Sequence, residues 1–327
     1  MKKNLLKPML AAFALCGLAV GGAHAQSAAP AGSVTRLVIA FPAGGPVDFV
    51  VRTISDKLGK ELGRTIVVDN KPGANGNIAA ESVARANPDG STLFFSSVGT
   101  IVINPSLYDK VPFDTFRDFA PVSLVVNNST IFVVNQASPF KSVPELVDAS
   151  KKANAPIAIA STGIGGMPHL TLEMFSDASK ANLLHVPYKG AAPAITDLLG
   201  NQVGGFFGDI PGLIAHIQGG KLRPLGIASP KRSAVLPDVK TLGEQGYPVV
   251  EANNWYAVVA PIKVPKDQIA ALNGAIARTV ADPEVRGKLL KSGAEPSPST
   301  QDELAALMKK DTAKWASVIK EKKIKAE

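Results

Sequence analysis

Residues 41–48, with the sequence FPAGGPVD, have the composition of an anion-binding loop. They follow an apolar run at 37–40 and open a helical pattern, so a strand, a glycine turn and a helix start come in that order. Backbone N–H groups at a helix N-terminus have no partner inside the helix and lie at the positive end of its dipole. A carboxylate placed there gains hydrogen bonds and about 0.3–1 kcal/mol of dipole attraction. We therefore expect this loop to bind a small anion, although similar residues also form ordinary turns.

Two roles are open to the acid of this first glycine loop. As a first-turn residue, Asp48 would complement the helix dipole, and as a site residue it would orient the loop or accept a hydrogen bond from a ligand. The candidate residues of the loop are Pro42, Ala43, Gly44, Gly45 and Asp48.

A second glycine loop, residues 161–169 with the sequence STGIGGMPH, repeats the order of strand, loop and helix start. It offers hydroxyl groups as well as backbone donors. The phosphate-binding pattern G-x-x-x-x-G-K-[S/T] is absent, so no nucleotide cofactor is expected. His169 is either a ligand contact or a structural residue of the helix start. The candidate residues here are Ser161, Thr162, Gly163 and His169.

Three further polar residues stand at the ends of predicted strands. Ser97 ends a strand over 92–97, Tyr188 ends a strand over 183–188, and Asp209 follows a strand over 203–207. Tyr188 and Asp209 are candidates to contact the far end of a ligand. The alternatives are a half-buried tyrosine with its hydroxyl in water, and an aspartate that caps the helix after Pro211. The segment 251–256 is predicted as hinge strand, cleft wall or both.

Enzyme signatures are absent from the sequence. There is no G-x-S-x-G elbow, no H-E-x-x-H pattern and no histidine set with metal-ligand spacing, so we expect neither catalysis nor a metal site. A hydrolase triad of Ser161, His169 and Asp209 needs three-dimensional proof. The net charge of +8 is spread along the chain, and basic grooves with interleaved aromatic residues are absent, so nucleic acid is not an expected partner.

The N-terminus has the features of an export signal. Lysines 2, 3 and 7 precede an apolar stretch at 9–20, and Ala23-His24-Ala25 matches an A-x-A cleavage site. We expect residues 1–25 to be removed after Ala25, together with Cys16, which is the only cysteine, and the mature protein to be exported. The alternative is a retained membrane anchor, for which the stretch is short.

Strand and helix signals alternate along the chain, among them a helix over 47–62 and a strand over 131–135, which indicates an α/β fold. The helical patterns near the C-terminus have no strands of their own, so they should pack on the sheet formed by the first part of the chain. This predicts one lobe of residues 33–130 plus 256–327 and a second lobe of residues 131–255. The chain would cross between the lobes near 130 and 256, and these two crossings would form a hinge beside a cleft.

An ordered set of short motifs strongly resembles the Bug family, the extracytoplasmic binding proteins of tripartite tricarboxylate transporters. The motifs are FPAGGPVD at 41–48, NKPG at 70–73, PDG at 88–90, INP at 103–105, VPYKG at 186–190 and LPDV at 236–239. The resemblance implies a two-lobed periplasmic-binding-protein fold (type II, Venus flytrap) that closes on a carboxylate such as an organic acid, an acidic amino acid or an aromatic acid. It implies membrane transporter subunits as partners and a monomeric receptor without a cofactor.

The resemblance also assigns the grip on the carboxylate to residues 42–48 and 161–166. Two departures from the family pattern bear on selectivity. Val47 stands where family members often have Ser or Thr, and Gly208 separates Phe207 from Asp209 where they often have Phe-Asp. Two other functions stay open: ligand presentation to a two-component sensor kinase, and a periplasmic hydrolase.

Overall fold

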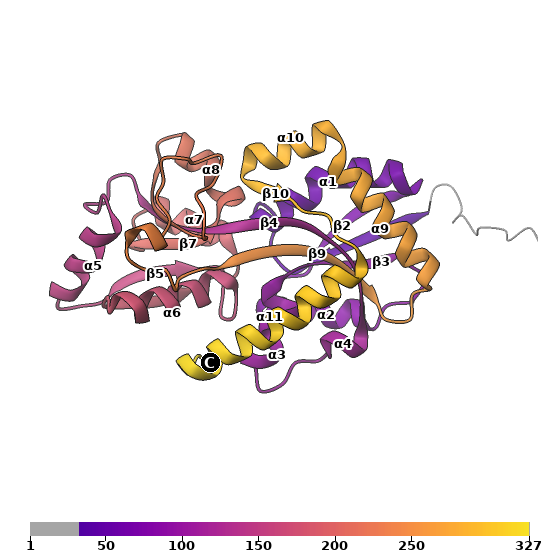
Figure 1. The fold of residues 1–327 in the computed structure, drawn as a ribbon, viewed down its shortest axis with the longest axis horizontal. Coiled ribbons are helices and arrows are strands. Elements are labelled where there is room, and N and C mark those ends of the chain that lie inside the picture. The colour runs from indigo at the N-terminus through magenta and orange to yellow at the C-terminus, as the bar shows by residue number, and fades with distance from the viewer. Residues whose placement is uncertain (1–32, 327) are drawn as a thin grey trace, which may run out of the picture. The chain divides into compact units, whose positions relative to one another are not determined.

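The structure, a computed structural model, describes residues 33–326 (Figure 1). The predicted signal peptide and its cleavage after Ala25 lie outside the described residues. Helices cover both faces of a mixed, ten-stranded sheet, as expected for an α/β chain. Among residues 33–326, no helix is both long and apolar enough to cross a bilayer.

Helix α1 (Pro46–Leu62) illustrates how local sequence fixes an element. Gly45 is the N-cap in an extended conformation, and Pro46 occupies the first turn, where its missing N–H costs nothing. Gly63 ends the helix in the left-handed conformation and donates its N–H to the carbonyl oxygen of Lys60 at 3.3 Å. The predicted helix over 47–62 is confirmed.

One part of the sheet, called sheet A, carries the first glycine loop. Strand β1 (Val34–Ile39) pairs in parallel with β2 (Thr65–Asn70) and with β3 (Thr92–Ser97). Strand β3 pairs antiparallel with β9 (Asn253–Pro261), and β9 pairs antiparallel with β4 (Phe119–Asn135). Because β1 and β3 are parallel, the loop after β1 and the residues after β3 lie at the same edge of the sheet.

Strand β4 belongs to both parts of the sheet. It pairs with β9 as far as Ser129, opposite Asn253, and from Thr130 onward it pairs with β7 (Gly205–Asp209) and β8 (Leu222–Ala228). The sequence predicted a strand only from Ile131, so the prediction missed the segment that continues back to Phe119. The partner change at Ser129 and Thr130 falls where the first crossing was expected, while the division into two lobes stays a prediction.

The other part, called sheet B, carries the second glycine loop. Strand β5 (Ile157–Ser161) pairs in parallel with β6 (Leu183–Pro187) and β7. Helices α6 (Met167–Ser179), α7 (Ala191–Leu199) and α8 (Ile210–Gln218) follow β5, β6 and β7 in turn. The strand predicted over 203–207 is shifted in the structure, so Asp209 is the last residue of β7.

The remaining elements complete the layers. The C-terminal part was expected to be purely helical, but it contains the short strand β10, which pairs with β4. The elements are the 3₁₀ turns Ala74–Gly76 and Gly243–Gln245, α2 (Asn77–Ala84), a π-helical turn Gly99–Ile103, α3 (Asn104–Leu107), α4 (Thr115–Asp118), α5 (Val143–Lys152), α9 (Lys266–Ala281), α10 (Pro283–Ser292), β10 (Ala294–Pro296) and α11 (Gln301–Lys322).

Three apolar clusters hold these layers together. One packs α1, α9 and α10 onto sheet A, with Val51 and Ile276 fully or almost fully buried. A second packs α7 and α8 onto sheet B. The largest contains residues of both sheets, among them Phe94, Phe207 and Trp255. Each buried large side chain contributes roughly 1.5–3 kcal/mol, so these clusters fix the strand ends from which the site is built.

Candidate functional site

A small cavity lies where several helices begin. Its walls include the N-cap Gly45 of α1, the first residue Ala191 of α7, and Asp209, the N-cap of α8. Its volume is about 20 Å³, which is room for roughly one water molecule. The lining residues are Phe41, Gly45, Pro46, Val47, Ser97, Thr162, Ala191, Asp209, Asn254 and Tyr256.

The first glycine loop presents free backbone donors to this cavity. Among the hydrogen bonds of residues 33–326, none uses the N–H groups of Gly45, Val47 or Asp48, as expected for the first turn of a helix. Pro46 has no N–H. Gly45 and Val47 line the cavity, and binding of an anion by their N–H groups stays a prediction.

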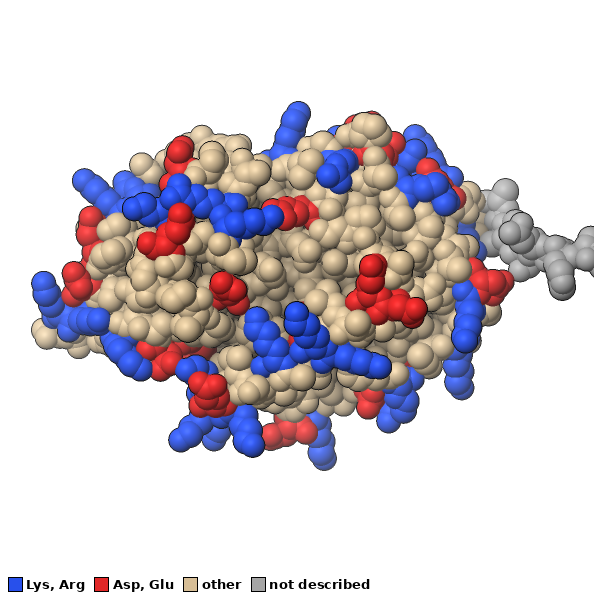
Figure 2. All heavy atoms as spheres, viewed as in Figure 1, with Lys and Arg blue, Asp and Glu red and all other residues tan. Residues whose placement is uncertain are grey.

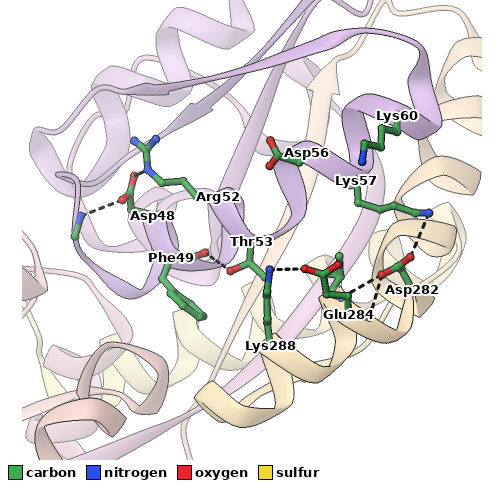
Figure 3. Close-up of a pocket in the computed structure, with 12 residues that line it drawn as sticks. Asp48, Phe49, Arg52, Thr53, Asp56, Lys57, Lys60, Asp282, Glu284 and Lys288 are labelled. Atoms are coloured by element: carbon green, nitrogen blue, oxygen red, sulfur yellow. Dashed lines mark hydrogen bonds and ion pairs between the residues drawn. The ribbon is translucent and has the colours of Figure 1, made fainter.

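Asp48 holds the conformation of this loop through hydrogen bonds of its carboxylate. Its Oδ2 accepts from the N–H of Gly44 at 3.0 Å, and its Oδ1 accepts from Arg52 Nε at 2.9 Å (Figure 3). Oδ1 also accepts from Asn70 Nδ2 at 3.1 Å. Burial raises the pKa of Asp48, but the hydrogen bonds from Arg52, Gly44 and Asn70 outweigh it and hold that pKa below its usual value. Asp48 does not line the cavity, so it orients the loop.

Only part of the second glycine loop lines the cavity. Thr162 is at the wall. Ser161, which is fully buried, lies with its Oγ 2.6 Å from His185 Nε2 and also accepts the N–H of Gly163 at 3.2 Å. The N–H of Gly165 donates to Nδ1 of His169 at 3.2 Å. These groups are therefore engaged within the protein, behind the loop.

The start of α7 closes the cavity against the first loop. Gly190 has φ +114°, and a Cβ placed there would lie 2.9 Å from Cδ of Pro42. This close approach of the Pro42 ring to the backbone at residue 190 needs glycine. Tyr188 points elsewhere: its hydroxyl donates to Asp197 Oδ2 at 2.6 Å. Burial, and then the hydrogen bond with Asp197, raise the pKa of Tyr188 to about 12.

Asp209 forms a buried polar group at the cavity wall. Its Oδ2 accepts from Asn254 Nδ2 at 2.7 Å and from the hydroxyl of Tyr256, whereas its Oδ1 has no partner among residues 33–326. The side chain makes no capping bond to α8, although it occupies the N-cap position. Burial raises the pKa of Asp209 to about 7, so near neutral pH the carboxyl group is poised between its two protonation states.

The structure brings four of the twelve predicted site residues to the cavity, namely Gly45, Ser97, Thr162 and Asp209. Pro42 touches the same region through Gly190, whereas Ala43 and Gly44 are exposed. Asp48, Ser161, Gly163, His169 and Tyr188 make internal hydrogen bonds near it. Asn254 and Tyr256 were expected only as hinge or cleft wall. Only their position at the return crossing suggested that they belong to the site. The sequence of an apolar strand does not show toward which side its amide and phenol side chains point.

A larger groove lies outside the loop, along α1 and α10 (Figure 3). Its volume is about 670 Å³, and acidic and basic side chains alternate along it. Lys57 lies 3.2 Å from Asp282 Oδ2, and Lys288 lies 2.7 Å from Glu284 Oε1. Because these charges already compensate one another in an open groove, size alone does not make it the anion site. The face in Figure 2 likewise intersperses basic and acidic side chains.

The site lacks the Ser161, His169 and Asp209 triad that the sequence left open for hydrolysis. Ser161 pairs with His185, and Asp209 accepts hydrogen bonds from Asn254 and Tyr256. The hypothetical triad with His169 is therefore not formed. Within the described residues no group of three His, Cys, Asp or Glu could hold a metal ion.

Comparisons with known proteins identify the family and support the fold. Residues 50–324 match the family described as the tripartite tricarboxylate transporter family receptor. The structure of the periplasmic binding protein BugD is 34% identical, with a TM-score of 0.86 over 90% of this chain and 99% of that chain. The structure of Rpa4515 of R. palustris with adipate is 29% identical, with a TM-score of 0.87 over 90% and 98% of the two chains. MatC of Rhodopseudomonas palustris, with bound malate, is 29% identical, with a TM-score of 0.84 over 88% and 99%.

Proposed function

Because the chain belongs to the tripartite tricarboxylate transporter receptor family, we propose that it captures a small carboxylate and delivers it to the membrane subunits of such a transporter. It is a solute-binding receptor with the α/β fold of Bug-type periplasmic binding proteins, and not an enzyme. Its location would be the periplasm, after cleavage following Ala25, and its working state a monomer.

One observation carries the proposal. Gly45 and Val47, whose N–H groups make no hydrogen bond among residues 33–326, line the same cavity as Thr162 from the second loop and Ala191 at the start of α7. Backbone donors at helix starts are suited to a carboxylate, since they supply hydrogen bonds and positive potential without a counter-charge. Across the cavity, Asp209 Oδ1 is buried and unpartnered within residues 33–326, so a ligand group can satisfy it.

Capture requires the cavity to widen. A ligand site normally measures about 300–1,000 Å³, far above the volume present here. We expect the parts 33–130 plus 256–327 and 131–255 to move apart as two lobes, with the backbone bending at Ser129 and Thr130, where β4 changes partners. The bound carboxylate would then stabilise the closed arrangement by its higher affinity for it.

The ligand class follows from the two sides of the cavity, namely the first glycine loop and Asp209. The first loop would hold one carboxylate through N–H donors, and Asp209, in its protonated form, would donate a hydrogen bond to a second carboxylate. The similar proteins Rpa4515 and MatC hold adipate and malate, which carry two carboxylates each, so dicarboxylates are the first compounds to test. Val47 contributes no hydroxyl, so the grip at the first loop would depend on backbone groups.

Gly45→Leu tests the proposal. A Cβ at Gly45 would lie 3.8 Å from the carbonyl oxygen of Pro42 and 3.9 Å from Cβ of Ala191, which are ordinary contacts, and φ of −87° suits any residue. The added atoms would fill the cavity and leave the fold intact. We expect calorimetry with malate, adipate, citrate and benzoate to give at least one binder for the natural protein, and a loss of about 100-fold or more for Gly45→Leu.

Gly287→Leu is the matched control, because a Cβ at Gly287 on α10 meets no atom within 4 Å. It should bind as the natural protein does. Equal binding by Gly45→Leu would reject the loop assignment. Uptake of the bound acid should fail in cells that lack the receptor and return with the natural chain but not with Gly45→Leu; uptake that is unaffected would reject the transport role.

A further inference from the structure

A cluster of polar side chains, with Ser161 and His169 buried and His185 and Glu173 half-buried, lies behind the second glycine loop. The rings of His169 on α6 and His185 on β6 are stacked, with centroids 4.0 Å apart and planes 10° from parallel. His169 is 5% exposed and Ser161 is fully buried, so neither side chain is free to contact a ligand. The fourth member, Glu173, lies with Oε1 3.5 Å from His169 Nε2.

The hydrogen bonds of this cluster end on the loop backbone. Nδ1 of His169 accepts the N–H of Gly165, which requires that Nδ1 carry no proton and that the proton sit on Nε2, facing Glu173. Ser161 Oγ accepts the N–H of Gly163 and contacts His185 Nε2. His169 therefore binds the amide of Gly165 directly, and His185 contacts the amide of Gly163 through Ser161.

These two amides belong to glycines with unusual backbone angles. Gly163 has φ +132° and Gly165 has φ +82°. Glycine has no side chain that would favour one backbone conformation, so hydrogen-bond partners elsewhere in the protein must fix these angles. Thr162, which lines the cavity, lies between Ser161 and Gly163 in the chain, and its direction therefore depends on where this part of the loop is held.

We propose that His169 and His185 are positioning residues that act through Gly165 and Gly163 to hold the second loop in its carboxylate-binding form. Neither side chain touches the ligand. This inference rests on the proposed function for the identity of what the loop binds, but the hydrogen bonds it requires exist in the protein without any ligand.

The first test measures the unliganded protein by NMR. The ¹⁵N shifts of His169 should report an unprotonated Nδ1 and a protonated Nε2 at pH 7.5, and the amide of Gly165 should exchange slowly with solvent. His169→Leu should accelerate that exchange by at least tenfold. His169→Asn, whose Oδ1 can occupy the place of Nδ1, should restore slow exchange. Protonation at Nδ1, or exchange at Gly165 that is equal in all three proteins, would overturn the proposal.

The second test measures binding with the panel of malate, adipate, citrate and benzoate. His169→Leu should weaken binding at least tenfold, and His169→Asn should remain within about threefold of the natural protein. His185→Gln, which keeps a nitrogen near the position of Nε2, should likewise bind better than His185→Leu. His216→Leu, on the far end of α8, is the control and should bind normally.

The two proposals fail in different ways. If the natural protein binds no acid of any kind, the proposed function fails, while the NMR result still decides whether the histidines hold the loop. If the acids bind but His169→Leu binds as tightly as the natural protein, the positioning role fails and the function stands. Should His169→Leu not fold, His169→Asn and the natural protein still give the tautomer and the exchange rate.

Discussion

Tyr256 on β9 donates its hydroxyl hydrogen to Asp209 on β7, so this bond spans the intervening strand β4. Tyr256 is fully buried and Asp209 is 4% exposed. Burial, followed by the charge of Asp209, raises the pKa of Tyr256 well above its usual value, so the phenol remains a donor. The bond joins a strand of sheet A to a strand of sheet B at the place where β4 changes partners.

The stability of Asp209→Asn, compared with that of the natural protein at the same pH, should increase as pH rises. The folded pKa of Asp209 is about 7, above the ordinary 3.8, so the folded state binds a proton that the unfolded state has lost. That contribution to stability is complete below pH 3.8 and disappears as pH rises through 7. The free energy of unfolding of the variant, relative to the natural protein, should therefore rise by about 1.4 kcal/mol per pH unit between pH 5 and 7 and then level off.

Urea unfolding at pH 5, 6, 7 and 8 measures this difference. The Asn side chain can still accept from Tyr256 and Asn254 through its oxygen, so the shape of the site is kept. The exposed Asp267→Asn on α9 is the control and should give a difference that does not vary with pH. A constant difference for Asp209→Asn would mean that Asp209 is ionised throughout.

Gly190→Ala should weaken carboxylate binding beyond what its backbone strain explains. A Cβ at Gly190 would lie 2.9 Å from Pro42, so the start of α7 could no longer close against the first loop. Gly246→Ala is the matched control, since Gly246 also has a left-handed φ, of +96°, but no atom within 4 Å of an added Cβ. Both variants should lose roughly 1–3 kcal/mol of stability from strain.

Only Gly190→Ala should also lose binding, by at least tenfold in calorimetry with the acid panel. Equal affinities for the two variants would show that the approach of Gly190 to Pro42 is unimportant for capture.

His185→Gln should reduce the sensitivity of the fold to acid. Burial, together with the nearby His169, lowers the pKa of His185 from 6.5 to about 4. Below pH 6.5 His185 is therefore protonated in the unfolded state, whereas in the folded state it is protonated only near pH 4. The folded state loses stability as pH falls between these two values. The melting temperature of His185→Gln relative to the natural protein should rise as pH falls from 6.5 to 4.5. His216→Gln should give no such trend, and the idea fails if His185→Gln gives none either.

Helices and their ends were the most predictable part of the fold. The apolar spacing of α1 and its flanking Pro46 and Gly63 carry the needed information locally, and so does the capping box of Thr300 and Glu303 at the start of α11. The long strand β4 was only half predicted. Its first part contains a proline and polar residues, and its strand state depends on pairing with the distant β9.

The two glycine loops were predictable as strand-to-helix connections, but their contacts were not. Glycine, proline and helix periodicity located both loops, and their role in binding stays a prediction. They could not tell that Ser161 and His169 turn away from the cavity, or that Tyr188 bonds Asp197, because the direction of a side chain is decided by partners far along the chain. Only the position of Tyr256 near the return crossing pointed to it, because its contact with Asp209 depends on the pairing of β9 and β7 with β4.

A cavity with room for about one water has a consequence for the concentration range over which the receptor responds. A dicarboxylate can enter only the fraction of molecules whose walls have separated, and the measured dissociation constant is the intrinsic one divided by that fraction. An open population of roughly one in ten would weaken the measured affinity about tenfold, with every contact to the acid unchanged. The strength of capture is therefore set jointly by the groups that touch the acid and by how often the molecule admits it.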